Sequence, residues 1–329
     1  MVSVYVPSLL KDKIVKAVEG RCALCELRIS DLELNPLNLM LIGRDLSFRN
    51  SPKSHTRLRI QSHKIAVGVD WSSLFRPPLS ISLVEVDGFK IEIEENHHPK
   101  QKVSQKVLTV LEGSYGGRWM EDFPEIVVQN LRVRNSQLTY ILDIFKKKAV
   151  IGLSDISADL SKVATRKELA PRFANMSATG RLQESGHFKI EIVADLFSVV
   201  NEDKIKIEVR DQKMSELDSF FAIEDGIRFG GLIEEARADL GLQQGILRGN
   251  LMASYRDLSF RFSSTPETSA FGAMISGIVE KLKIEKTKPE AGQPQPAVWV
   301  DYRRRPEESL IQFLLAGLKS AAFKLISKQ

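Results

Sequence analysis

The stretch LSISLVEVDGFKIEIEE, residues 79–95, decides the fold class that we predict for this chain. Before Gly88 its apolar residues alternate with serines, and after Gly88 they alternate with lysine and glutamate. Alternation with a period of two residues is typical of a strand that has one dry face and one wet face. The Asp87-Gly88 pair between the two runs is a strong hairpin signal, so we predict two antiparallel strands joined there.

Looser versions of this pattern recur along most of the chain. One of them, ISDLELNPLNLMLIGRDLSFRN at residues 29–50, alternates on both sides of an Asn-Pro pair. Successive runs are separated by Asx or glycine turns at a spacing of roughly eight to twelve residues, as in all-β proteins. We therefore predict a mainly β chain with a few helices. Further alternating runs lie at 56–71, 124–141, 186–196, 202–211 and 235–264.

The composition is that of an ordinary folded protein with a mildly basic surface. The 329 residues carry a formal net charge of +5 at pH 7, and 27% of them are charged. This balance weakly favours anionic partners such as lipid headgroups, although interleaved lysine and glutamate are more typical of a solvated surface. The basic runs at 146–148 and 303–305 have no interleaved aromatic residues, so we predict no nucleic-acid partner.

Cys22 and Cys25 are the two cysteines of the chain. A lone Cys-x-x-Cys can be a redox pair or half of a zinc site. No second cysteine pair follows, no histidine pair stands at ligand spacing, and on a strand the two side chains would point to opposite faces. We expect two small, buried or half-buried side chains, no bound metal and no disulfide framework.

Motifs for catalysis are missing from the sequence. It contains no glycine-rich dinucleotide or phosphate loop, no Gly-x-Ser-x-Gly and no His-Glu-x-x-His. His97 and His98 are adjacent, so on an extended segment they point apart and do not share a metal. We therefore predict that the protein is not an enzyme and has no cofactor. A site assembled from distant residues would leave no such motif.

Capping residues, prolines and composition divide the chain. The opening MVSVYVPSLL is too short to span a membrane, and no run of about 18 apolar residues occurs elsewhere. The N-terminal segment is either the remnant of a membrane-anchor region or a natural start. We predict an N-terminal amphipathic helix at 1–21, a β region at 22–264 with a helical or loop insertion at about 96–122, a helix at 265–284, a Pro/Gly-rich linker at 285–298 and a C-terminal amphipathic helix at 299–329.

The last of these helices carries an apolar stripe with lysines beside it. Two roles stay open for this stripe, because it can cap the sheet or dock on a membrane or a protein partner. The residues of the stripe are Ile311, Leu314, Leu315, Leu318, Ala322 and Leu325.

Several segments, in their order along the chain, resemble the AsmA-like proteins of Gram-negative envelopes. LELNPLNLMLIGRDLSF, at 32–48, is similar to the N-terminal signature of that family, and the stretches at 65–93 and 231–260 are similar to its later paired strands. The tail at 304–326 resembles the closing helix of the branch known as a domain of unknown function. The chain is shorter than the larger members and does not contain their N-terminal membrane helix.

The resemblance implies a long curved antiparallel sheet, a β-groove, with an apolar concave face. Larger members are thought to conduct or hold phospholipids between the two membranes, which implies a periplasmic, inner-membrane-associated protein with phospholipid or fatty acyl chains as partners. The inner-membrane surface or an envelope protein would bind the terminal helices. The candidate groove lining is Leu58, Ile60, Phe89, Ile91, Ile93, Leu131, Val133, Leu138, Phe188, Ile190, Ile192, Ile205 and Ile207.

An alternative stays open for these residues. They can form an ordinary closed core, and the protein would then be a structural or interaction scaffold in an envelope complex, without a lipid ligand.

Overall fold

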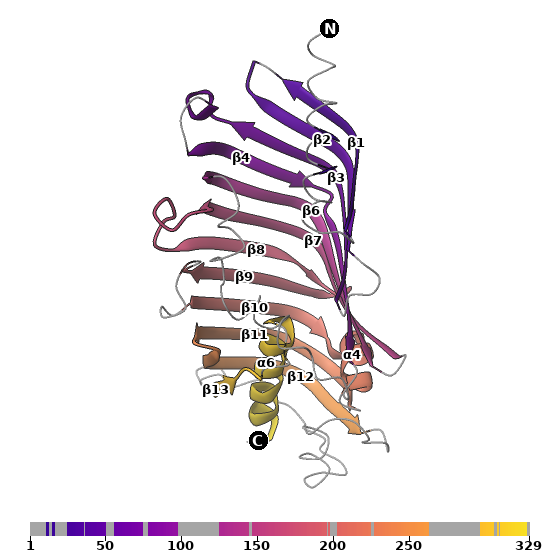
Figure 1. Ribbon diagram of the computed structural model, residues 1–329. Helices are drawn as coiled ribbons and strands as arrows, with labels where there is room; N and C mark the ends of the chain where they lie inside the picture. The colour runs from indigo at the N-terminus through magenta and orange to yellow at the C-terminus, as the bar shows by residue number, and fades with distance from the viewer. Residues whose placement is uncertain are drawn as a thin grey trace. The chain divides into compact units, whose positions relative to one another are not determined.

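The computed structural model shows a mainly β chain in which thirteen strands form one mostly antiparallel sheet (Figure 1). The strands follow chain order across the sheet, except that β5 continues the line of β4 and, like β4, pairs with β3 and β6. The predicted fold class is confirmed at this level. The structure describes residues 11–12, 15–16, 25–35, 37–50, 56–74, 78–97, 125–144, 147–195, 197, 203–224, 227–262, 297–305, 308 and 310–327.

Contacts within the chain divide it into two units. Unit 1 is Met1–Asn96, Gly116–Leu142 and Gly152–Ala178, and unit 2 is His97–Tyr115, Asp143–Ile151 and Thr179–Gln329. The strands are β1 (Glu26–Asn35), β2 (Met40–Arg49), β3 (Thr56–Val69), β4 (Leu79–Asp87), β5 (Lys90–His97), β6 (Ile126–Ile144), β7 (Lys147–Ala164), β8 (Ala174–Leu182), β9 (Gly186–Ala194), β10 (Asp203–Lys213), β11 (Ile227–Gln243), β12 (Ile246–Phe262) and β13 (Ala297–Arg303). The helical elements are η1 (Trp71–Leu74), η2 (Met214–Leu217), α4 (Asp218–Glu224) and α6 (Leu310–Ser327).

The predicted hairpin at Asp87-Gly88 is wrong. Strands β4 and β5 both pair with β3 in one uninterrupted register, in which Lys64 lies opposite Asp87 and Gln61 lies opposite Lys90. Gly88 has a φ of +66°, so it bends one long strand instead of reversing it. The sequence signal reports only that the backbone at this position needs φ > 0, which a strand kink and a hairpin turn share.

Strands β4 and β6 are parallel neighbours, which the sequence did not indicate. Strand β4 runs in the same direction as β6, with Val86 opposite Val133 and Leu79 opposite Ile126. Eight other neighbouring pairs are antiparallel, namely β1–β2, β2–β3, β3–β4, β3–β5, β9–β10, β10–β11, β11–β12 and β12–β13, and a tight turn joins β11 to β12. In that turn Gln244 and Gly245 both have positive φ, the geometry that two-residue hairpins prefer.

In unit 1, residues of positive φ also interrupt several strands. Asp45 on β2, Asn135 on β6 and Asp155 on β7 have φ angles of +47°, +51° and +51°. A Cβ built on Gly43 of β2 would lie 3.7 Å from Leu32 and 4.0 Å from Ile29, so two residues three apart on the neighbouring β1 share a face. Beside Asp45 the alternation of β1 therefore shifts by one residue, while its register with β2 is kept.

Unit 2 repeats this device. On β10, Val209 lies opposite Phe188, and Gln212 lies against Gly186 of the same neighbouring strand. Residues three apart therefore share a face on either side of Asp211, whose φ is +56°. Aspartate and asparagine tolerate this backbone conformation better than other non-glycine residues. Such shifts explain why the alternation in the sequence is looser than an ideal period of two.

The core of unit 2 lies between its strands and α6. Phe313 and Ala321 of α6 are fully buried against Leu247 and Val300 of the sheet. A Cβ on Gly317 would stand 2.7 Å from Leu247, so the absence of a side chain there allows the helix to approach the sheet closely. Strand β13, which precedes α6, occupies residues that the sequence assigned to a linker and to the C-terminal helix.

Several predicted segments lie outside the described residues. Of the N-terminal helix at 1–21, only residues 11–12 and 15–16 are described, and they are helical. Most of the insertion at 96–122, the whole helix at 265–284 and most of the linker at 285–298 lie outside. Among the helices that the structure describes, none is long and apolar enough to cross a membrane.

The expectation for the cysteines needs a correction. Cys25 is half-buried immediately before β1, as expected, but it is disulfide-bonded. Sequence spacing alone could not show this, because pairing depends on the local backbone path as well as on spacing.

Candidate functional site: the apolar faces of the sheet

Unit 1 carries the first part of the candidate site, an apolar face built from cross-strand pairs. Ile60 of β3 lies opposite Ile91 of β5, and Leu58 lies opposite Ile93. Directly opposed residues point to the same face of a sheet. The face therefore joins these strands, and on the neighbouring strands Val84 and Val86 of β4 lie opposite Leu131 and Val133 of β6.

The predicted lining residues of unit 1 are half-buried. This holds for Leu58, Ile60, Phe89, Ile91, Ile93, Leu131, Val133 and Leu138. Each keeps part of its apolar surface in contact with solvent, which is costly over such a row because exposed apolar area is unfavourable at about 25 cal/mol per Å². Among the described helical elements of unit 1, the main sheet contact is that of η1 with β4.

A polar pair interrupts the apolar face of unit 1. Glu95 continues the alternation of Ile91 and Ile93 along β5 and is only 9% exposed. The hydroxyl of Tyr140 donates a 2.7 Å hydrogen bond to Oε2 of Glu95. Tyr140 is only 2% exposed. Sequence reasoning missed this pair, although the continued alternation placed Glu95 on the apolar side of β5. On the other face, Glu94 is buried and paired with Arg57 at 3.4 Å.

Unit 2 carries a second apolar face. Ile190 of β9 lies opposite Ile207 of β10, which in turn lies opposite Ala238 of β11. Ile192, Ile205 and Leu240 form the adjacent row. The predicted lining residues of unit 2 thus lie on one face: Phe188 and Ile205 are buried, whereas Ile190, Ile192 and Ile207 are half-buried.

Helix α6 covers one end of this second face. Its contacts are chiefly with β12 and β13, and Leu314, Leu318 and Ala322 of the predicted stripe pack against the buried cluster of the sheet. The two most buried residues of the helix, Phe313 and Ala321, were missing from the prediction. Each directly precedes a residue of the predicted stripe, so the buried face is turned slightly from the predicted one. Leu315 is half-buried, and the side chains of Ile311 and Leu325 lie outside the described residues.

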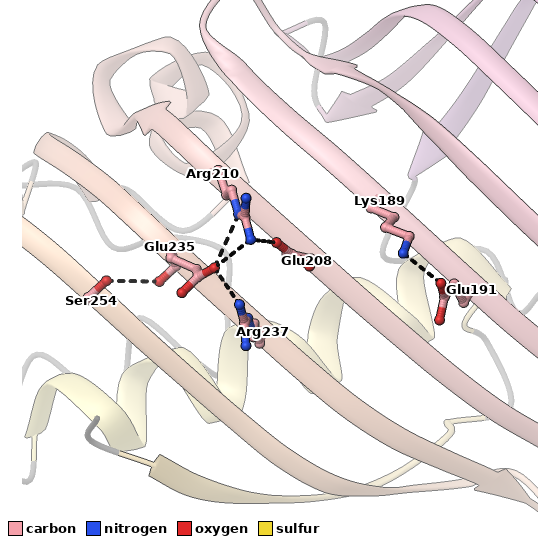
Figure 2. A network of polar contacts seen from close by, with 7 residues as sticks. All are labelled: Lys189, Glu191, Glu208, Arg210, Glu235, Arg237 and Ser254. Carbon is pink, nitrogen blue, oxygen red and sulfur yellow. Dashed lines mark hydrogen bonds and ion pairs between the residues drawn. The ribbon is translucent and has the colours of Figure 1, made fainter. Parts of the chain in front are cut away.

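The opposite face of unit 2 is polar, as Figure 2 shows. Glu235 accepts hydrogen bonds from Arg210 at 3.1 Å and Arg237 at 2.8 Å, and Arg210 also pairs with Glu208. On β9, Lys189 bonds Glu191 at 2.7 Å and holds the pKa of that carboxyl below its ordinary value. Exposed ion pairs contribute little stability each. Because these charged side chains favour water, this face stays hydrated. Successive residues of a strand point to opposite faces, so the apolar residues between them lie on the other face.

Glu216 of η2 fixes the turn that precedes β9. Its Oε2 accepts hydrogen bonds from the Ser185 amide at 3.0 Å, the Ser185 hydroxyl at 2.8 Å and Gln212 Nε2 at 3.2 Å. Burial by itself raises the pKa of Glu216, but the bonds from Ser185 and Gln212 outweigh burial and lower it. Because β9 carries part of the apolar face, this carboxylate indirectly positions that face.

The two apolar faces are built mainly from aliphatic side chains. Among the described residues no cluster of histidine, cysteine or carboxylate side chains could hold a metal ion. Rows of half-buried isoleucine, leucine and valine provide a surface on which apolar chains can lose water. No protein-family model matches this sequence, and no characterised protein matches it at a significant level.

Proposed function

We propose that this chain binds phospholipid or fatty acyl chains along the apolar faces of its sheet, as a non-enzymatic AsmA-like protein that holds or transfers lipid between the membranes of a Gram-negative envelope. In this proposal the sheet is a long curved β-groove. The observation that carries it is the set of half-buried apolar residues in unit 1, where Ile60 lies opposite Ile91 and Val133 lies opposite Val86.

Acyl chains suit such a surface for a simple energetic reason. Each methylene group removed from water contributes about 0.8 kcal/mol, so ten methylenes laid on these strands outweigh the ordering of one chain. Aliphatic side chains in alternating register need no polar residue to hold an acyl tail. The proposal therefore agrees with a sequence that lacks catalytic and metal-binding motifs.

Two observations support a periplasmic location at the inner membrane. Cys25 is disulfide-bonded, and stable disulfides form in oxidising compartments such as the periplasm. Arg303 and Arg305, just before α6, are exposed cations that suit an anionic headgroup surface. We include the inner-membrane surface, or an envelope protein, as the partner of the terminal helices, and no nucleic acid.

A second candidate function has one observation in its favour. Helix α6 already covers one end of the apolar face of unit 2 and buries Phe313 completely. A sheet closed in this way along its whole length would be a scaffold within an envelope complex and would leave no room for lipid.

The decisive experiment is native mass spectrometry of gently purified protein, followed by organic extraction and lipid analysis. We expect phospholipid at close to one equivalent or more, lost in Ile91→Asp and in Val133→Asp. The matched control is Lys90→Asp, which places the same charge on the exposed face beside Ile91. Circular dichroism verifies that each variant is folded. An unliganded mass that persists after incubation with phospholipid vesicles would exclude the lipid function and favour the scaffold.

A further inference from the structure

Strand β13 ends the sheet, and its outer side has no strand partner among the described residues. The phase of its hydrogen bonds follows from Arg304, whose amide donates to the Gly245 carbonyl at 2.9 Å. In an antiparallel ladder, alternate residues direct both backbone groups to the same neighbour. Tyr302, Val300 and Val298 therefore bond β12, and the backbone groups of Ala297, Trp299, Asp301 and Arg303 point outward.

Two of the features that usually protect a sheet edge against pairing, a bulge and a proline, are missing from β13, although it carries the charged residues Asp301 and Arg303. Its register with β12 runs without a bulge from Ala297 to Arg303, and it contains no proline. Trp299 is 55% exposed and lies on the face opposite α6. At the other end of the sheet, by contrast, Lys11 of the N-terminal segment donates to the Ser30 carbonyl of β1 at 3.1 Å. An unbulged edge with a large exposed aromatic residue is a template for another strand.

We propose that β13 pairs antiparallel with β13 of a second copy of this chain, about a two-fold axis at Val300. In this register Trp299 lies opposite Asp301 of the second copy, and Ala297 lies opposite Arg303. The outward backbone groups then satisfy one another. The pairing joins the two apolar faces through Val298, Val300 and Tyr302, and it removes part of the Trp299 ring from water.

Charge selects this register over its neighbours. An axis at Asp301 would place two aspartates directly opposite each other, which destabilises a strand pair. An axis at Trp299 would leave Arg303 outside the paired strands. With the axis at Val300, no like charges are directly opposed. The sequence of β13 is therefore complementary to itself when reversed about Val300.

The dimer should be weak. Stable interfaces bury about 1,200–2,000 Å² in total, and two seven-residue strands with one tryptophan each cover less than that. We expect a concentration-dependent equilibrium between monomer and dimer in the micromolar range. The inference does not depend on lipid binding, because the backbone edge exists whether or not the apolar faces hold a ligand.

The test is sedimentation equilibrium of the full chain from low micromolar to several hundred micromolar concentration. Asp301→Pro removes an outward amide without removing a bond to β12, so we expect the dimer dissociation constant to rise about tenfold or more. Asp301→Ala is the matched control, because it keeps the amide and should dimerise within a few-fold of the unmodified protein. A monomer at every concentration, or Asp301→Pro that dimerises like the control, would overturn the proposal.

A distance measurement between two spin labels tests the register separately. It also keeps the proposal testable in case the Asp301→Pro variant does not fold. Ala297 is exposed, so we expect a cysteine introduced there, Ala297→Cys, to accept a nitroxide label without disturbing the fold. Pairing about Val300 places the two labelled backbone positions about 20 Å apart, since they lie at opposite ends of the paired strands. A dimer without this distance would contradict β13 pairing.

Discussion

The hydroxyl of Tyr140 on β6 donates a 2.7 Å hydrogen bond to Oε2 of Glu95 on β5, and both side chains are buried. Tyr140→Phe would leave that buried carboxylate without one of its donors. We expect the free energy of unfolding to fall by about 1–3 kcal/mol, the usual cost of an unsatisfied buried polar group. Urea unfolding followed by circular dichroism measures this.

Glu95→Gln provides the comparison for Tyr140→Phe. Its side-chain carbonyl still accepts the phenolic hydrogen bond, so we expect a smaller loss of stability. Equal stability of Tyr140→Phe and the unmodified protein would show that the bond contributes nothing to folding.

Gly88 provides a second prediction. Its φ of +66° is strained for a residue with a side chain, and a Cβ there would lie 3.1 Å from that of His63. Gly88→Ala should lower the free energy of unfolding by about 1–2 kcal/mol. Gly88→Asn should cost less, because asparagine tolerates φ > 0. Thermal and urea unfolding of both variants check the order, and an alanine variant as stable as glycine would contradict the kink.

Glu216 should make unit 2 sensitive to acid. Its pKa is lowered in the folded protein from an ordinary value of 4.5. The folded state therefore binds a proton less readily than the unfolded chain does, so the stabilisation is present above pH 4.5 and is lost as pH falls through the lowered pKa. In Glu216→Gln this component should be missing at neutral pH, and stability should change less on acidification. Parallel unfolding curves for the two proteins at all pH values would refute the role of Glu216.

Phe313 tests whether α6 belongs to the core of unit 2. The ring is fully buried against the sheet, so Phe313→Ala should cost about 3–5 kcal/mol. The matched change Lys324→Ala, at an exposed position of the same helix, should stay within about 0.5 kcal/mol. An apolar dye should bind Phe313→Ala more strongly, since the end of the apolar face loses its cover. A small cost for Phe313→Ala would mean that α6 is not anchored there.

Period-two alternation was a reliable guide to fold class and to sidedness. In unit 2 the candidate lining residues share a face because they alternate along β9 and β10 and lie opposite one another across these strands. In unit 1 the same holds for the pairs between β3 and β5. The alternation was less informative where Asp45, Asn135 or Asp211 adopts positive φ. A one-residue shift at such a position is invisible to a fixed period, and the sequence shows it only as a change of phase.

The sequence by itself determined that this protein is mainly β and that its strands have alternating apolar and polar residues. These are properties of neighbouring residues, which depend on side-chain direction along a single strand. Only the tertiary structure decided that Gly88 bends a strand, that β4 and β6 run parallel, that Glu95 bonds Tyr140 and that α6 covers β12 and β13. Each of these depends on which distant segments become neighbours, and a local pattern carries no information about that choice.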